Sequence, residues 1–70
     1  MSTYVYKDGA KKFEIDIVET RGGVRVTLTD KGVTTQLCTA KSLEAAFKEV
    51  ETMFSAAGKP APRPEEWKQI

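Results

Sequence analysis

Apolar and polar residues alternate through the first forty positions, and glycine-containing turns divide this part of the chain into four runs. The turns are predicted at Asp8-Gly9, Gly22-Gly23 and Lys31-Gly32, because glycine adopts positive φ angles at no steric cost. The runs are rich in Val, Ile, Thr, Tyr and Phe, which favour extended structure. The sequence therefore predicts four antiparallel strands, over Thr3–Lys7, Ala10–Thr20, Val24–Asp30 and Val33–Thr39.

Two-residue turns would place the large apolar side chains of all four runs on one face, with Val33 among them. A slip of one residue would invert a strand, so this agreement supports the predicted pairing. The expected cross-strand pairs are Tyr4–Phe13, Ile17–Leu28 and Val26–Leu37.

The opposite face of this sheet is expected to be flat, polar and rich in threonine. If no other part of the chain covers it, this face is a binding platform, a dimer interface or a solvated surface. Its predicted members are Lys12, Glu14, Asp16, Val18, Arg25, Thr27, Thr29, Thr34, Gln36 and Cys38.

The clearest periodicity follows the fourth run, where apolar residues recur at helical spacing from position 43 to position 57. Ser42 is the predicted N-cap and Gly58 the predicted C-terminal stop. The apolar stripe of the helix and the apolar face of the sheet would each be exposed to water unless they packed together. The sequence therefore predicts an α+β fold, a four-stranded antiparallel β-meander packed on one C-terminal helix (ββββα). The stripe consists of Leu43, Ala46, Phe47, Val50, Phe54 and Ala57.

Residues 1–58 are expected to form the single domain, and residues 59–70 a proline-rich C-terminal tail. Prolines at positions 60, 62 and 64 exclude a regular helix and favour an extended, polyproline-like segment, with one short helical turn after Pro64. Trp67 and Ile70 are the large apolar residues of this tail. Trp67 is expected either to pack on the core, within the chain or across a dimer, or to dock on a partner.

Composition narrows the classes of chemistry. The 70 residues hold eleven basic and ten acidic side chains, a net charge of +1, which gives little long-range field toward nucleic acid. The chain has no histidine and a single cysteine, Cys38, so an imidazole base, a structural zinc site and an internal disulfide are excluded. We expect no enzyme activity, and no catalytic, cofactor-binding or metal residues.

Glu14 and Asp16 are the strongest candidates for acid–base chemistry, because they lie roughly 7 Å apart on one strand face. They are interpreted as part of a solvated surface, since a domain of this size offers little concavity. No apolar run is long enough to span a bilayer, so a cytoplasmic location without membrane partners is expected.

The order of elements resembles that of some DNA-binding domains. The stretch Val24–Phe47, with Thr39–Ala46 at the helix start, is similar to three-stranded integrase arm-binding domains and plant AP2 domains. Four strands followed by one helix also resembles single-stranded-DNA-binding coactivator domains. The resemblance implies binding through basic and aromatic side chains on the exposed sheet, whereas this chain places no aromatic side chain there for base stacking.

The leading hypothesis is a non-catalytic protein-interaction module, a small accessory protein of bacterial or phage type, that binds a protein partner or a second copy of itself. The alternative is a nucleic-acid-binding domain that uses the sheet face and the hairpin loops, with affinity that falls steeply with salt. Its cations would be Lys11, Lys12, Arg21, Arg25 and Lys31. The partner-binding residues expected under the leading hypothesis are Arg25, Thr27, Thr29, Thr34, Gln36, Trp67 and Ile70.

Overall fold

Strands rich in β-branched and aromatic residues form an antiparallel meander, followed by one helix. The computed structural model describes residues 2–9 and 12–70, and within them it confirms the predicted α+β architecture. A fifth, two-residue strand from the tail adds to the sheet, giving the order β4-β3-β2-β1-β5. The strands are β1 (Thr3–Asp8), β2 (Phe13–Thr20), β3 (Gly23–Asp30), β4 (Val33–Ala40) and β5 (Lys68–Gln69), and the helix is α1 (Leu43–Ala56).

The turn between β3 and β4 has the predicted geometry. Lys31 (φ 53°) and Gly32 (φ 80°) both have positive φ, as a type I′ hairpin turn requires. The turn between β2 and β3 lies one residue earlier than predicted, because Gly23 is already paired with Thr20. The second strand begins at Phe13 rather than Ala10; Ala10 and Lys11 lie outside the described residues.

Two of the predicted pairings are wrong, yet the predicted faces are right. Tyr4 lies opposite Ile17 rather than Phe13, and Ile17 lies opposite Val26 rather than Leu28. The β1–β2 connection is longer than a two-residue turn, and the β2–β3 turn lies earlier than predicted. Both changes shift the register by an even number of residues, which leaves the side chains of β1, β2 and β3 on their expected faces.

The third pairing is wrong because β4 contains a bulge. Val26 lies opposite Cys38 and Thr27 opposite Gln36, so Leu37 is an extra residue between them. The bulge moves Cys38 from the predicted polar face to the apolar face, where it packs against the core together with Ala40. The physical reason is that small side chains fit beneath the helix there.

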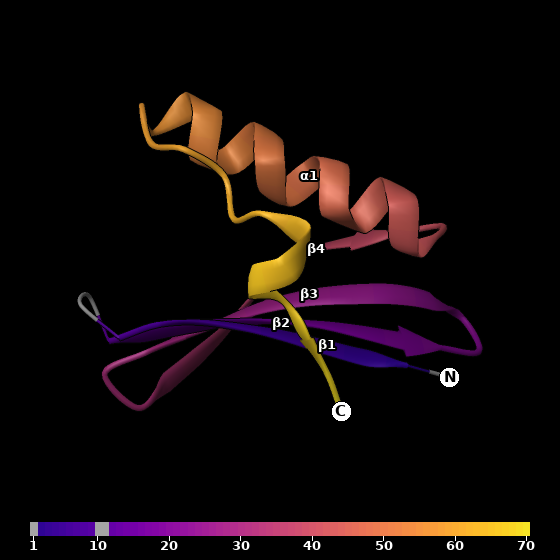
Figure 1. The fold of residues 1–70 in the computed structure, drawn as a ribbon. Helices are drawn as coiled ribbons and strands as arrows, with labels where there is room; N and C mark the ends of the chain where they lie inside the picture. Colours follow the sequence, from indigo (N-terminus) through magenta and orange to yellow (C-terminus); the bar gives the residue numbers. More distant parts are fainter. Residues whose placement is uncertain (1, 10–11) are drawn as a thin grey trace.

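The helix has the predicted ends and lies over one face of the sheet (Figure 1). Ser42 caps it, since its Oγ accepts a hydrogen bond of 3.2 Å from the backbone N–H of Ala45. Gly58 follows with φ 72°, the left-handed conformation that ends many helices. The core between the helix and the inner face of the sheet is made by Ile15, Ile17, Val24, Val26, Ala46 and Val50.

Three predicted core residues, Val33, Leu37 and Ala57, are exposed and not in the core. Val33 lies opposite Asp30 at the far end of the sheet and is 65% exposed. No helix among the described residues is long and apolar enough to cross a membrane.

The tail returns from the end of α1 to the sheet, where the yellow segment of Figure 1 reaches β1. A short 3-10 helix at Pro64–Glu66 turns the chain, with the backbone N–H of Glu66 donating to the carbonyl of Arg63 at 2.9 Å. β5 then pairs antiparallel with Tyr4 and Val5. The last backbone N–H, of Ile70, donates to the carbonyl of Thr3 at 2.9 Å, which ties the tail to the first strand.

Candidate interaction surfaces

The face of the sheet turned away from α1, here called the outer face, is not covered by any element of the described chain (Figure 1). The strand registers arrange its side chains in three rows that run across the strands. The rows are Thr3–Val18–Arg25–Thr39, Lys68–Val5–Asp16–Thr27–Gln36 and Lys7–Glu14–Thr29–Thr34.

Five of the predicted binding residues come together on the β3–β4 half of this face. Thr27 lies opposite Gln36, and Thr29 lies opposite Thr34 with their hydroxyl oxygens 3.0 Å apart. Arg25 stands exposed beside them in the next row. All five come before the bulge at Leu37, so the alternation of side chains predicts their face correctly.

The outer face also carries two apolar side chains beside Asp16, Val5 and Val18, of which only Val18 was predicted there. Val5 is only 8% exposed although it points away from the helix, because it lies between Asp16 on β2 and Lys68 on β5. The alternation Tyr4-Val5-Tyr6 was the available signal, since both tyrosines belong to the inner face. Val18, in the next row, is half-buried.

Asp16, in the middle of this face, has a strongly raised pKa. Burial is the main cause that raises its pKa from 3.8 to about 6, followed by a hydrogen bond with the Glu14 side chain and repulsion from its charge; Lys7 acts in the opposite direction. The Oδ1 atom of Asp16 is buried and has no hydrogen-bond partner among the described residues. Glu14 in turn lies 3.9 Å from the Lys7 ammonium group. The Asp16 carboxyl group therefore holds its proton more tightly than an exposed aspartate does.

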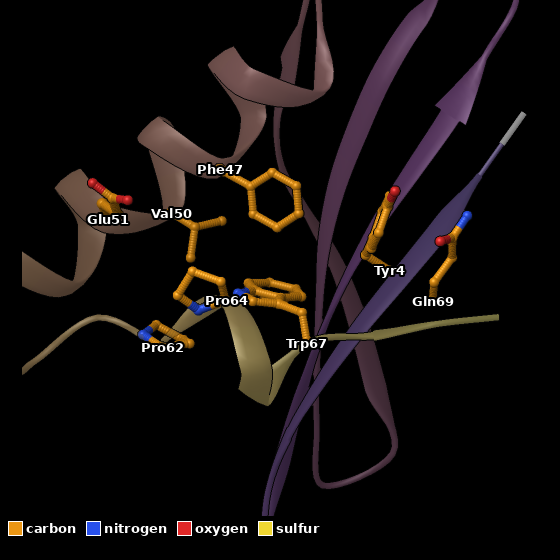
Figure 2. A pocket seen from close by; sticks show the side chains of 8 residues that line it. All are labelled: Tyr4, Phe47, Val50, Glu51, Pro62, Pro64, Trp67 and Gln69. Carbon is orange, nitrogen blue, oxygen red and sulfur yellow. The ribbon is translucent and has the colours of Figure 1, made fainter.

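Trp67, the sixth predicted binding residue, packs within its own chain on the helix side of the sheet. Its ring meets Phe47 edge-on at 5.2 Å between centroids and Tyr6 at 5.7 Å. Figure 2 shows the indole between the helix and the tail, with Phe47 above it and Pro64 beside it. Of the alternatives considered for Trp67, the structure therefore shows packing on the core of its own chain, where it extends the aromatic cluster.

A pocket of about 460 Å³ lies where the tail passes between α1 and β1 (Figure 2). Aromatic rings and prolines make most of its wall, and the carboxylate of Glu51 and the amide of Gln69 lie at its rim. The rings of Phe47 and Trp67 contact each other directly. The pocket lies between α1, the tail and β1, which all contribute to its wall.

The remaining predicted residues do not join the outer-face group. Ile70 is 83% exposed beyond β5, at the opposite edge of the sheet from β4. The cations of the nucleic-acid alternative divide between the two ends of the sheet. Lys12 and Lys31 lie together at one end and Arg21 at the other, while Lys11 is outside the described residues.

The chemistry of the sulfur and of metal ligands adds no further site. Burial, and then the charge of Glu49, raises the pKa of the Cys38 thiol above its ordinary value, which disfavours the reactive thiolate. Among residues 2–9 and 12–70, no cluster of three or more Cys, Asp or Glu side chains is arranged to hold a metal ion.

Comparison of the chain with protein-family models, with curated proteins and with solved structures finds no match. The function of this chain must therefore be inferred from the geometry of its surfaces.

Proposed function

We propose that this chain is a non-catalytic protein-interaction module that binds a protein partner through the outer face of its sheet. The observation that carries the proposal is the arrangement of this face, which spans the sheet without a covering element. Its β3–β4 half presents hydroxyl and amide groups beside the exposed guanidinium of Arg25.

The composition of the outer face fits a protein partner. Protein interfaces combine an apolar centre with a polar, hydrogen-bonding rim. Here Val5 and Val18 are the apolar part, on β1 and β2, and Thr27, Thr29 and Arg25 are the polar part, on β3. A small-molecule site would instead need a concave pocket with convergent polar groups. Ile70, exposed at the far edge, is proposed as a secondary contact of the same module.

Nucleic acid is the competing partner, and the same experiment distinguishes it. The net charge of +1 gives little long-range attraction for phosphates, and among the described residues Arg21 lies at the opposite end of the sheet from Lys12 and Lys31. Binding through phosphate contacts would weaken steeply with salt and would disappear after nuclease treatment.

The test is affinity capture from nuclease-treated bacterial lysate with three forms of the tagged chain: wild type, Arg25→Glu and Lys48→Glu. Both variants make the same change in net charge at an exposed position, but Arg25 lies on the outer face and Lys48 on α1. The proposal predicts one stoichiometric protein partner that Lys48→Glu retains. It predicts that Arg25→Glu loses most of that partner.

Equal loss of the partner in both variants would show that net charge, not the outer face, governs binding. Recovery of nucleic acid before nuclease treatment, with no protein retained afterwards, would replace the proposal with the nucleic-acid alternative.

A further inference from the structure

The two edge strands of the sheet differ in how well they are protected against pairing with another strand. At one edge the tail adds β5, a strand of two residues that includes Lys68 and covers part of β1. The other edge is β4, which is eight residues long and has neither a charged residue nor a proline. Short length, lysine and proline are the usual features that keep a sheet edge from pairing with another strand. β4 lacks all three.

The side chains of β4 are also accessible. Six of its eight residues are exposed, and Val33 and Leu37 are two of the large apolar residues with exposed side chains. On the inner side, an apolar groove of about 270 Å³ runs between the sheet and the second half of α1, and Leu37 contributes to its wall together with Leu28, Met53 and Phe54. A strand placed beside β4 would cover this exposed apolar surface.

We propose that β4 pairs with β4 of a second copy of this chain, antiparallel, so that the two sheets become continuous. A two-fold axis perpendicular to the sheet brings the two edges together and keeps both helices on the same side. Such an axis places each strand opposite itself, which penalises a charged strand by like-charge contacts. β4 carries Val, Thr, Gln, Leu, Cys and Ala, which pair with themselves without repulsion.

The bulge at Leu37 limits where the pairing is regular. From Val33 to Gln36 the strand pairs in order with β3, and the extra residue interrupts the ladder only after Gln36. The expected intermolecular ladder is therefore centred on residues 33–36. Thr35, whose side chain is exposed, lies close to the two-fold axis.

A second copy also suits the size of the chain. A 70-residue domain has a small core, and dimerisation is a common source of additional stability at this length. The paired outer faces would form one larger surface on the side away from both helices. The pairing uses the backbone edge of β4, whereas the proposed function uses side chains of the outer face; Thr34 and Gln36 belong to both surfaces.

The test is sedimentation equilibrium of the full chain over a wide concentration range. The wild type is expected at twice the chain mass of 7.8 kDa. Thr35→Lys and Thr35→Glu are each expected to sediment as monomers with unchanged far-ultraviolet circular dichroism, because like charges then meet near the axis. An equimolar mixture of the two variants is expected to restore the dimer.

The matched controls are Thr52→Lys and Thr52→Glu, which make the same changes at an exposed threonine of α1 and should remain dimeric. A wild-type monomer at the highest concentration, or dimers that persist in both Thr35 variants, would overturn the proposal. If the Thr35 variants do not fold, amide hydrogen exchange of the wild type decides: exchange in residues 33–36 must slow as the concentration rises, and unchanged exchange contradicts the pairing.

Discussion

Asp16 couples the outer face to pH. Its pKa of about 6 in the folded chain exceeds the ordinary value of 3.8, so the folded state binds this proton more tightly than the unfolded state does. Protonated Asp16 therefore supports the fold below pH 3.8. This contribution is lost as the pH rises through 6, where the carboxylate becomes charged beside Glu14.

Replacing Asp16 with asparagine should remove this dependence. Asp16→Asn is expected to raise the midpoint of thermal unfolding relative to wild type above pH 6, and to change it least below pH 3.8, because asparagine stays neutral throughout. Thermal melts of both proteins from pH 3 to pH 8 measure the difference. A difference that is constant with pH would contradict the assignment. Glu14→Gln serves as the control, since it should lower the pKa of Asp16 as followed by nuclear magnetic resonance.

Gly23 is fixed by two independent constraints. Its φ is 138°, and a Cβ added there would stand 2.9 Å from the carbonyl oxygen of Ala40 on β4. Gly23→Ala should therefore destabilise the domain by about 1–3 kcal/mol, through backbone strain and displacement of the β4 end. The neighbouring Gly22 has open space around it, so Gly22→Ala should change the free energy of unfolding by less than about 0.5 kcal/mol. Urea denaturation of the two variants compares them directly, and equal effects would refute the argument.

Among the elements, the tail has a structural role that its composition does not reveal. Trp67 lies against Phe47 and Tyr6, and β5 pairs with β1 directly after it. Trp67→Ala should lower the free energy of unfolding by about 2–4 kcal/mol, somewhat less than for a fully buried tryptophan because the side chain is half-buried. Urea denaturation measures this value.

The control for this prediction is the other large apolar residue of the tail. Ile70→Ala should be nearly neutral, because that side chain is 83% exposed. A Trp67→Ala variant as stable as wild type would show that the tail does not contribute to the core in solution.

The elements differ in how far the sequence determines them. The helix follows from its own periodicity, its serine cap and its glycine stop, all of which are local. The hairpin registers are not local in this sense. Because shifts of two or four residues preserve the faces, the alternation alone could not distinguish Tyr4 opposite Ile17 from Tyr4 opposite Phe13.

The bulge and the fifth strand lie beyond sequence reasoning for a different reason. The bulge at Leu37 accompanies the packing of Cys38 and Ala40 under the helix, which is a tertiary effect. β5 is two residues long and pairs with residues more than sixty positions earlier in the chain, so it has no local signal. The β3–β4 half of the outer face could be predicted because it depends on alternation only up to Gln36.

In the whole molecule, some surfaces of the sheet are covered by other parts of the described chain and others are not. The inner face is covered by α1 and the tail, and the β1 edge is partly closed by β5. The outer face and the β4 edge have no counterpart within the chain. Both proposals follow from this asymmetry: the outer face is assigned to a protein partner and the β4 edge to a second copy.

Binding of a partner to the outer face is tested most directly by site-specific photocrosslinking in cells, with a photoreactive amino acid at position 27 on the outer face or at position 52 on α1. A partner on the outer face should give one discrete crosslinked product with a protein of a mass other than that of the chain itself, from position 27 and not from position 52. Equal crosslinking from both positions, or none from position 27, would contradict the assignment of the outer face as the binding surface.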